Sequence, residues 1–191
     1  MNLILKIDLF IREYLFKFKI LPDYLNSFFN YTGSIQIHLV LILTLLIYCY
    51  FNSTEYYKKN LKFFFRLCFL FSILYAIKIT VARVRPEFIN SELEKNLIAR
   101  LFDTRLHSFP SSHAAISGFY MKEYPKSTLL KILCLFICFS RLSSFQHFFF
   151  DVICGLFIGV YLNTLSSNIY NKFINKIKKA TYLSKLPFIR F

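Results

Sequence analysis

The sequence predicts an all-α integral membrane protein: a helical bundle of about five spans plus an N-terminal interfacial helix. Of its 191 residues, 56% are hydrophobic and 20% aromatic, which is more apolar than a soluble domain of this size. Apolar runs recur at nearly the length that an α-helix needs to cross a bilayer. The net charge of +14 comes from basic residues that flank these runs. This placement favours a membrane protein over a nucleic-acid-binding one, whose basic residues gather on a polar surface.

The five cysteines all lie within apolar stretches, where thiols usually serve as small buried hydrophobic groups. Cys134 and Cys138 are four residues apart, but no His or carboxylate is spaced to complete a metal site with them. The sequence therefore predicts no disulfide framework, no metal site and no cofactor.

Residues 1–33 are predicted to form an amphipathic interfacial segment. Residues 1–25 mix apolar and charged positions, so a helix in the headgroup region is favoured over a membrane crossing. Pro22 and residues 26–33 are expected to break the chain. A transmembrane domain is then expected over residues 34–166, and a basic cytoplasmic tail over residues 167–191.

Five apolar segments are expected to span the membrane. They cover residues 35–51, about 61–82, about 110–123, about 127–140 and about 147–165. The third is short, because fourteen helical residues rise only about 21 Å. The polar segment between the second and third spans, residues 83–109, is expected to contain a short helix around residues 91–101.

The distribution of lysine and arginine predicts the orientation. Cytoplasmic loops carry an excess of basic residues, which places the tail, the loop with Lys58 and Lys59, and the loop with Lys122 and Lys126 inside. Five spans then put residue 85 and the segments 110–113 and 141–147 together at the outer face. We therefore expect an integral protein of the plasma or inner membrane whose site faces outward.

Two polar residues beside the last apolar run indicate a catalytic site. His147 and Asp151 are four residues apart, so on a helix they share a face. The carboxylate of Asp151 could then accept a ring N–H from His147 and fix the tautomer of the imidazole. The other ring nitrogen would stay free to act as a nucleophile or a base.

Cationic groups in two further segments predict an anion-binding site. Lys78 and Arg85 are seven residues apart and could flank an anion, and Arg141 could add a bidentate contact. A helix that begins at Pro110 would direct its free backbone N–H groups at the same anion.

The three motifs, K-x6-R-P, P-S-x-H and S-R-x5-H-x3-D, resemble in this order the signature of the type 2 phosphatidic acid phosphatase family. Members of this family are membrane phosphatases related to vanadium haloperoxidases. The resemblance covers roughly residues 60–166. It implies that His147 attacks phosphorus to form a phosphohistidine, that Asp151 holds His147, and that His113 acts as the acid and base. The residues that it assigns to phosphate binding are Lys78, Arg85, Ser111, Ser112 and Arg141. The family needs no metal.

Ser112, Phe145 and Phe149 stand where the family commonly has Gly, Gly and Pro. Two functions are therefore considered. The first is a lipid phosphatase that releases phosphate from a lipid phosphate or diphosphate in the outer leaflet. The second is a membrane protein of the same fold with weakened chemistry, which binds lipid or partners. The expected partners are a lipid phosphate and the membrane, with no nucleic acid. The sequence leaves open the identity of the lipid and the oligomeric state.

Overall fold

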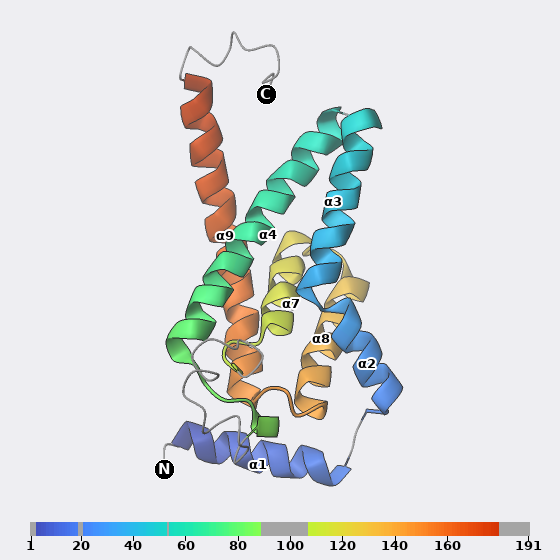
Figure 1. Cartoon of the computed structure of the whole chain (residues 1–191), viewed down its shortest axis with the longest axis vertical. Helices are drawn as coiled ribbons and strands as arrows, with labels where there is room; N and C mark the ends of the chain where they lie inside the picture. The colour runs from blue at the N-terminus through green and yellow to red at the C-terminus, as the bar shows by residue number, and fades with distance from the viewer. Residues whose placement is uncertain (1–2, 19–20, 53, 89–106, 180–191) are drawn as a thin grey trace.

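The computed structural model describes residues 3–18, 21–52, 54–88 and 107–179, and this part of the chain is almost entirely helical (Figure 1). The elements are α1 (Leu3–Phe18), α2 (Asp23–Thr32), α3 (Ile35–Asn52), α4 (Thr54–Val81), the 3-10 turn η1 (Pro86–Phe88), α7 (Ser112–Glu123), α8 (Thr128–Ser143) and α9 (Phe149–Lys179). No strand occurs among the described residues, although an isolated antiparallel bridge joins Val84 to His107. The expected all-α class is confirmed for these ranges.

Within the described part of the chain, two helices are long and apolar enough to cross a membrane, over Glu55–Val81 and Phe149–Ile177. A third crossing results if α2 and α3, which meet at an angle of 45°, are counted as one bent span. Helices α7 and α8 have 12 and 16 residues, fewer than the roughly 20 that a simple span needs. The count of five spans therefore stays a prediction.

Several boundaries differ from those expected from the sequence. The predicted break over residues 26–33 is wrong, because α2 is helical as far as Thr32. This helix is held in place by Phe29, which is buried and stacks on Phe136 of α8 with ring centroids 5.9 Å apart. Lys58 and Lys59 lie inside α4, and not in a loop before it. The boundary expected at residue 166 falls within α9. The helix expected around residues 91–101 lies outside the described residues.

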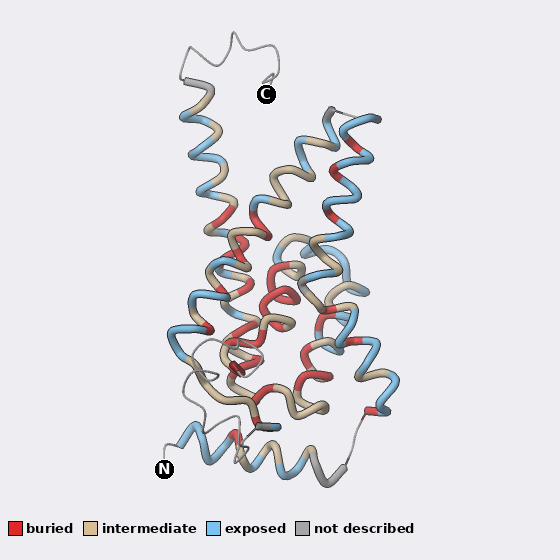
Figure 2. Tube along the Cα trace, in the orientation of Figure 1, coloured by how far each residue is buried: buried red, intermediate tan, exposed pale blue. Residues whose placement is uncertain are grey.

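Helix α7 forms the centre of the bundle, between α4, α8 and α9 (Figures 1 and 2). Its residues 114–119 are all buried. Gly118 on α7 and Gly159 on α9 allow the two backbones to come close, because a Cβ at either position would collide with a carbonyl group of the other helix. Small residues serve this purpose in many membrane bundles. The packing places the start of α7 beside the start of α9, where the N–H of Ser111 donates to the carbonyl of Asp151 at 3.1 Å.

Helix α1 runs across the end of the bundle at which α8 ends and α9 begins (Figure 1). Its large apolar side chains Leu3, Phe10 and Tyr14 are exposed. An exposed apolar face on a helix at the end of a membrane bundle is what an interfacial helix requires.

Candidate active site

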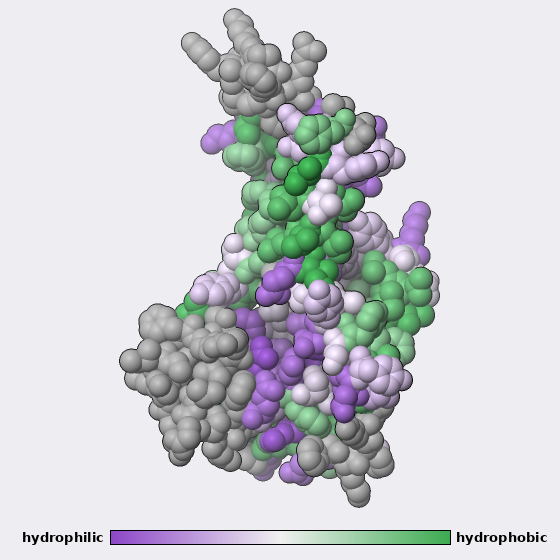
Figure 3. All heavy atoms as spheres, turned by 45° about the vertical axis from the view of Figure 1, so that its right-hand side comes forward, coloured by the Kyte–Doolittle hydropathy of each residue, from purple (hydrophilic) through white to green (hydrophobic). Residues whose placement is uncertain are grey.

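Five of the eight predicted site residues line one cavity of about 550 Å³. They are Lys78, Arg85, Ser112, His113 and His147. The rest of the lining comes from α4 and the start of α3, as Ser34, Gln36, Phe71, Ser72, Leu74 and Tyr75. Figure 3 shows hydrophilic side chains gathered below the largely hydrophobic surface of the long helices. The cavity thus combines cationic and imidazole groups with an apolar wall.

His147 lies in the loop before α9 and is held in a single tautomer. Its Nδ1 is 2.7 Å from the carbonyl oxygen of Ser108. Because a carbonyl can only accept, Nδ1 carries the proton and Nε2 keeps a lone pair. Burial lowers the pKa of His147 well below its usual range, and the nearby charges of Arg85 and Lys78 lower it further. The imidazole is therefore neutral near pH 7 and available as a nucleophile.

The expected hydrogen bond between His147 and Asp151 is not formed. Helix α9 begins at Phe149, so His147 precedes the helix and the two side chains do not share a helical face. The carboxylate of Asp151 instead accepts from the Ser108 hydroxyl, from the Phe148 N–H at 2.9 Å, and from Arg83 at 2.6 Å. Ser108 contacts both residues, so Asp151 holds His147 indirectly.

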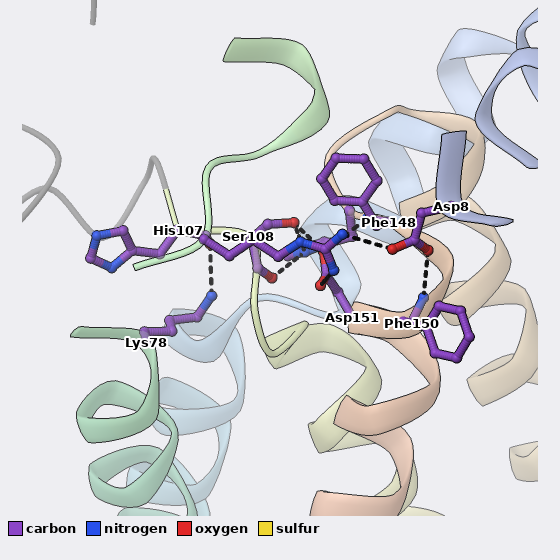
Figure 4. Close-up of polar contacts among 9 residues, drawn as sticks. Asp8, Lys78, His107, Ser108, Phe148, Phe150 and Asp151 are labelled. Carbon is purple, nitrogen blue, oxygen red and sulfur yellow. Dashed lines mark hydrogen bonds and ion pairs between the residues drawn. The ribbon is translucent and has the colours of Figure 1, made fainter. Parts of the chain in front are cut away.

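Lys78 and Arg85 share a backbone anchor. Lys78 Nζ donates to the carbonyl oxygen of His107 at 3.0 Å (Figure 4). Arg85 Nε lies 3.5 Å from the same oxygen. Arg85 also lies 3.6 Å from the carboxylate of Glu87. Residue 107, which belongs to none of the motifs, is fully buried. Its carbonyl fixes the two cations on the same side of the cavity.

Arg141, Ser111 and Asp151 are fully buried and do not line the cavity. Arg141 Nη1 donates to the side-chain oxygens of Asn30 at 2.6 Å and Gln146 at 2.8 Å. The hydroxyl of Ser111 has no hydrogen-bond partner among the described residues. These three groups lie behind the cavity lining, so any contact of Arg141 or Ser111 with a ligand requires a local shift.

Asn30 of α2 also contacts the second histidine. The Nε2 atom of His113 lies 3.0 Å from the carbonyl oxygen of Asn30, so Nε2 is the protonated nitrogen. While this contact holds, proton exchange with a ligand has to use Nδ1. The sequence motifs gave no sign of Asn30, Ser108 or Arg83, because each acts through contacts with residues far away in the chain.

The carboxylates around the site form ion pairs with arginine. Asp151 and Asp8 both pair with Arg83. Among the described residues, no group of three His, Cys, Asp or Glu side chains is arranged to hold a metal ion.

Comparison with known families agrees with the motif positions. The family model described as the PAP2 superfamily matches residues 59–175, which is more than half of the chain and includes all three motifs. The chain belongs to the PAP2 superfamily. A search of curated proteins gives no significant match.

The fold is similar to that of two solved structures. The transmembrane PAP2-type phosphatidylglycerolphosphate phosphatase from Bacillus subtilis is 19% identical, with a TM-score of 0.63 over 90% of this chain and 88% of that one. LpxE from Aquifex aeolicus is 24% identical, with a TM-score of 0.55 over 87% of this chain and 95% of that one. Together with the apolar helices, these likenesses identify an integral membrane protein with the PAP2 fold.

Two positions where this PAP2 chain departs from the common pattern have local explanations. Phe145 stands where Gly is common and has φ 55°, in the left-handed region that glycine adopts most easily. Phe149 stands where Pro is common and is the first residue of α9, a position that suits proline. Both positions flank His147 in the connection between α8 and α9.

Proposed function

We propose that this protein is a metal-independent lipid phosphatase that acts on a lipid phosphate or diphosphate through a phosphohistidine. The observation that carries the proposal is the position of His147. Its Nδ1 is fixed as a donor, so its unprotonated Nε2 is left beside a cavity that Lys78 and Arg85 also line. A neutral imidazole next to two cations suits attack on a phosphate ester.

The reaction proceeds in two displacements at phosphorus. Lys78, Arg85 and Ser112 bind the phosphoryl oxygens and stabilise the charge of the transition state. Nε2 of His147 forms a bond to phosphorus while the bond to the ester oxygen breaks. His113 gives a proton to that oxygen from Nδ1, which must first be protonated because the Nε2–H is bound to the carbonyl of Asn30. His113 then takes a proton from water, which attacks phosphorus and breaks the P–N bond to release inorganic phosphate.

The shape of the cavity supports a lipid as the substrate. Its polar residues adjoin Phe71, Leu74 and Tyr75 of α4. A second cavity of about 740 Å³ shares Ser34 and Gln36 with the first and is also lined by Ile37, Val40 and Leu41 of α3. A headgroup phosphate could therefore bind between the cations while its apolar chain lies along α3 and α4.

We further propose that the chain crosses the membrane five times and that the site faces the outer leaflet of the plasma or inner membrane. The basic residues at the far ends of α4 and α9 support this orientation. A cysteine at Glu13 should react with an impermeant maleimide in intact cells, and one at Lys172 only after permeabilisation, in a variant without the native cysteines. The reverse pattern would turn the site inward.

The second candidate function, a PAP2-fold protein with weakened chemistry, is favoured by one observation. Asn30 engages both Arg141 and His113 through its side-chain and backbone oxygens. In this arrangement, two groups assigned to catalysis by the family resemblance are bound to the protein itself. Such a chain would bind a lipid phosphate without releasing phosphate.

Phosphate release by the purified protein separates the two functions. The panel comprises phosphatidic acid, phosphatidylglycerophosphate, a polyprenyl diphosphate and a lipid A phosphate, each with and without EDTA. A phosphatase releases phosphate from at least one lipid in a way that depends on His147. Binding of a lipid phosphate with no release by the wild-type protein would support the second function instead.

A further inference from the structure

Helix α1 carries one buried carboxylate among exposed apolar side chains. Asp8 is 1% exposed, although its neighbours Leu5 and Ile7 are exposed. Burying a carboxylate is costly unless the charge is paired and hydrogen-bonded. The partners of Asp8 therefore show what α1 is attached to, and they lead to the active site.

Arg83 lies between Asp8 and Asp151 and binds both. Its Nη2 donates to Asp8 Oδ2 at 2.7 Å, and its Nη1 donates to Asp151 Oδ1 at 2.6 Å. The guanidinium group also lies 4.1 Å from the ring centroid of Phe148. A planar guanidinium that is bound by two carboxylates and an aromatic ring has a fixed orientation.

The same two carboxylates hold the beginning of α9. Asp8 Oδ1 accepts from the N–H of Phe150 at 3.0 Å, and Asp151 Oδ2 accepts from the N–H of Phe148 at 2.9 Å (Figure 4). The N–H groups at the start of a helix have no partner within it and bind carboxylates well. Because His147 directly precedes Phe148, these contacts also hold the backbone of His147.

Ser108 completes the connection to the imidazole. Its hydroxyl donates to Asp151, its N–H donates to the carbonyl of Arg83 at 2.6 Å, and its own carbonyl accepts from His147 Nδ1. Arg83 thus holds Ser108 both through its backbone and through Asp151. The carbonyl that selects the tautomer of His147 depends on this arrangement.

We propose that Asp8 and Arg83 are positioning residues of the active centre. Asp8 holds Arg83, Arg83 holds Asp151 and Ser108, and Ser108 keeps His147 in the tautomer that presents Nε2. Helix α1 is therefore part of the catalytic apparatus as well as a membrane-surface helix. This inference rests on the proposed phosphatase function for its kinetic consequences, but its geometry can be tested without turnover.

The test compares Arg83→Gln, Arg83→Lys, Asp8→Asn and the double variant Asp8→Asn/Arg83→Gln, with Arg12→Gln as the matched control on α1. The kinetics use a short-chain lipid phosphate, and rates are expressed per folded molecule after size-exclusion chromatography. Arg83→Gln should lower kcat by about 10²-fold, as small misplacements of a catalytic group do. KM should stay nearly constant, because neither residue lines the cavity.

Further variants separate positioning from a general effect on folding. Arg83→Lys should restore part of kcat, since it keeps the charge but not the two-sided guanidinium contact. The double variant should be no slower than Arg83→Gln, because residues that act through one chain of contacts are not additive. Arg12→Gln should match the wild type. An unchanged kcat for Arg83→Gln, or a loss expressed only in KM, would overturn the proposal.

A spectroscopic readout makes the result independent of turnover. In ¹⁵N-histidine NMR spectra, the signal of His147 is identified as the one that disappears in His147→Ala. In the wild type this signal should have the chemical shifts of the Nδ1–H tautomer. It should show a mixture of tautomers in Arg83→Gln and Asp8→Asn. The same tautomer in all variants would contradict the positioning role. A wild-type protein without turnover would refute the proposed function, and the NMR comparison would still decide the role of Asp8 and Arg83.

Discussion

Two ionic clusters lie at opposite ends of α7. At the end away from α1, Arg66 of α4 pairs with Glu123, the last residue of α7, at 2.7 Å. Arg66 also donates to the carbonyl of Asn163 at 3.1 Å and lies 5.3 Å from the ring centroid of Phe119. The amide of Asn163 donates to Glu123 at 2.9 Å, so this cluster links α4, α7 and α9 and balances its own charge.

The cluster at the α1 end is built from similar parts. Arg83 also binds carboxylates and lies over a phenylalanine ring. The difference is the adjoining cavity, whose described lining includes Lys78, Arg85 and two histidines and no acidic side chain. A buried ion pair alone therefore does not distinguish the two clusters. Cations that line a cavity do, because their charge attracts an anion.

The largest expected effect is the loss of the nucleophile at the α1 end. His147→Ala should lower phosphate release by about 10³-fold or more, since no other imidazole can take its place. Insertion and folding should be retained. The measurement is phosphate release from the best lipid of the panel, with His38→Ala as the control, because His38 contacts Tyr120 outside the site cavity. Substantial activity in His147→Ala would refute the assignment.

Two lysines of α4 give the next test. Lys78→Met should reduce kcat/KM by about 10²-fold, because it removes a fixed charge that stabilises the transition state. Lys62→Met is the matched control, since Lys62 lies on the same helix, does not line the cavity, and donates to Asn171 of α9. If the two variants lost activity equally, the distinction between the two ends would not hold.

The clustering of the candidate site residues at this end could be predicted from the sequence because their motifs have short spacings. Lys78 with Arg85, and Ser112 with His113, are close in the chain, and the structure places them at one cavity with His147. The apolar runs likewise predicted α3 to within one residue and α4 to within about two turns, whereas α9 continues well beyond its predicted end at residue 165.

The residues that hold the site could not be predicted in the same way. The ion pairs of Arg83 with Asp8 and Asp151 join positions 75 and 68 residues apart, so no local pattern contains them. The expected direct bond from His147 to Asp151 assumed a continuous helix. The backbone of Phe145 at φ 55° turns the chain, and α9 begins only after His147. Spacing predicts contacts only where the secondary structure is already known.

The cluster away from α1 is expected to contribute stability and little to turnover. Glu123→Gln keeps the shape of the side chain but leaves Arg66 buried without a counter-charge. Because Glu123 is partly exposed, the cost should lie below the roughly 3–5 kcal/mol of a fully buried ion pair. The melting temperature in detergent should fall, while kcat per folded molecule stays close to that of the wild type. Glu13→Gln, on an exposed position of α1, is the control. A loss of kcat as large as that of Lys78→Met would mean that both ends serve catalysis.

The smallest expected effect is that of metal removal, and it follows from what the two clusters share. At both ends the carboxylates are paired with a guanidinium group: the buried Asp8 and Asp151 with Arg83, and the partly exposed Glu123 with Arg66. A divalent cation prefers several carboxylate or carbonyl oxygens that converge on one point, and here those oxygens are already engaged by nitrogen donors. The charge of the phosphoryl group would instead be met by Lys78 and Arg85.

Phosphate release should therefore stay unchanged in excess EDTA. Vanadate, which adopts the five-coordinate shape of phosphoryl transfer, should inhibit the same samples and show that the site is intact. If activity were lost in EDTA and restored by added Mg²⁺, a metal ion would take part in the reaction. That ion would bind at the α1 end if Lys78→Met changed the affinity of the protein for Mg²⁺ and Glu123→Gln did not.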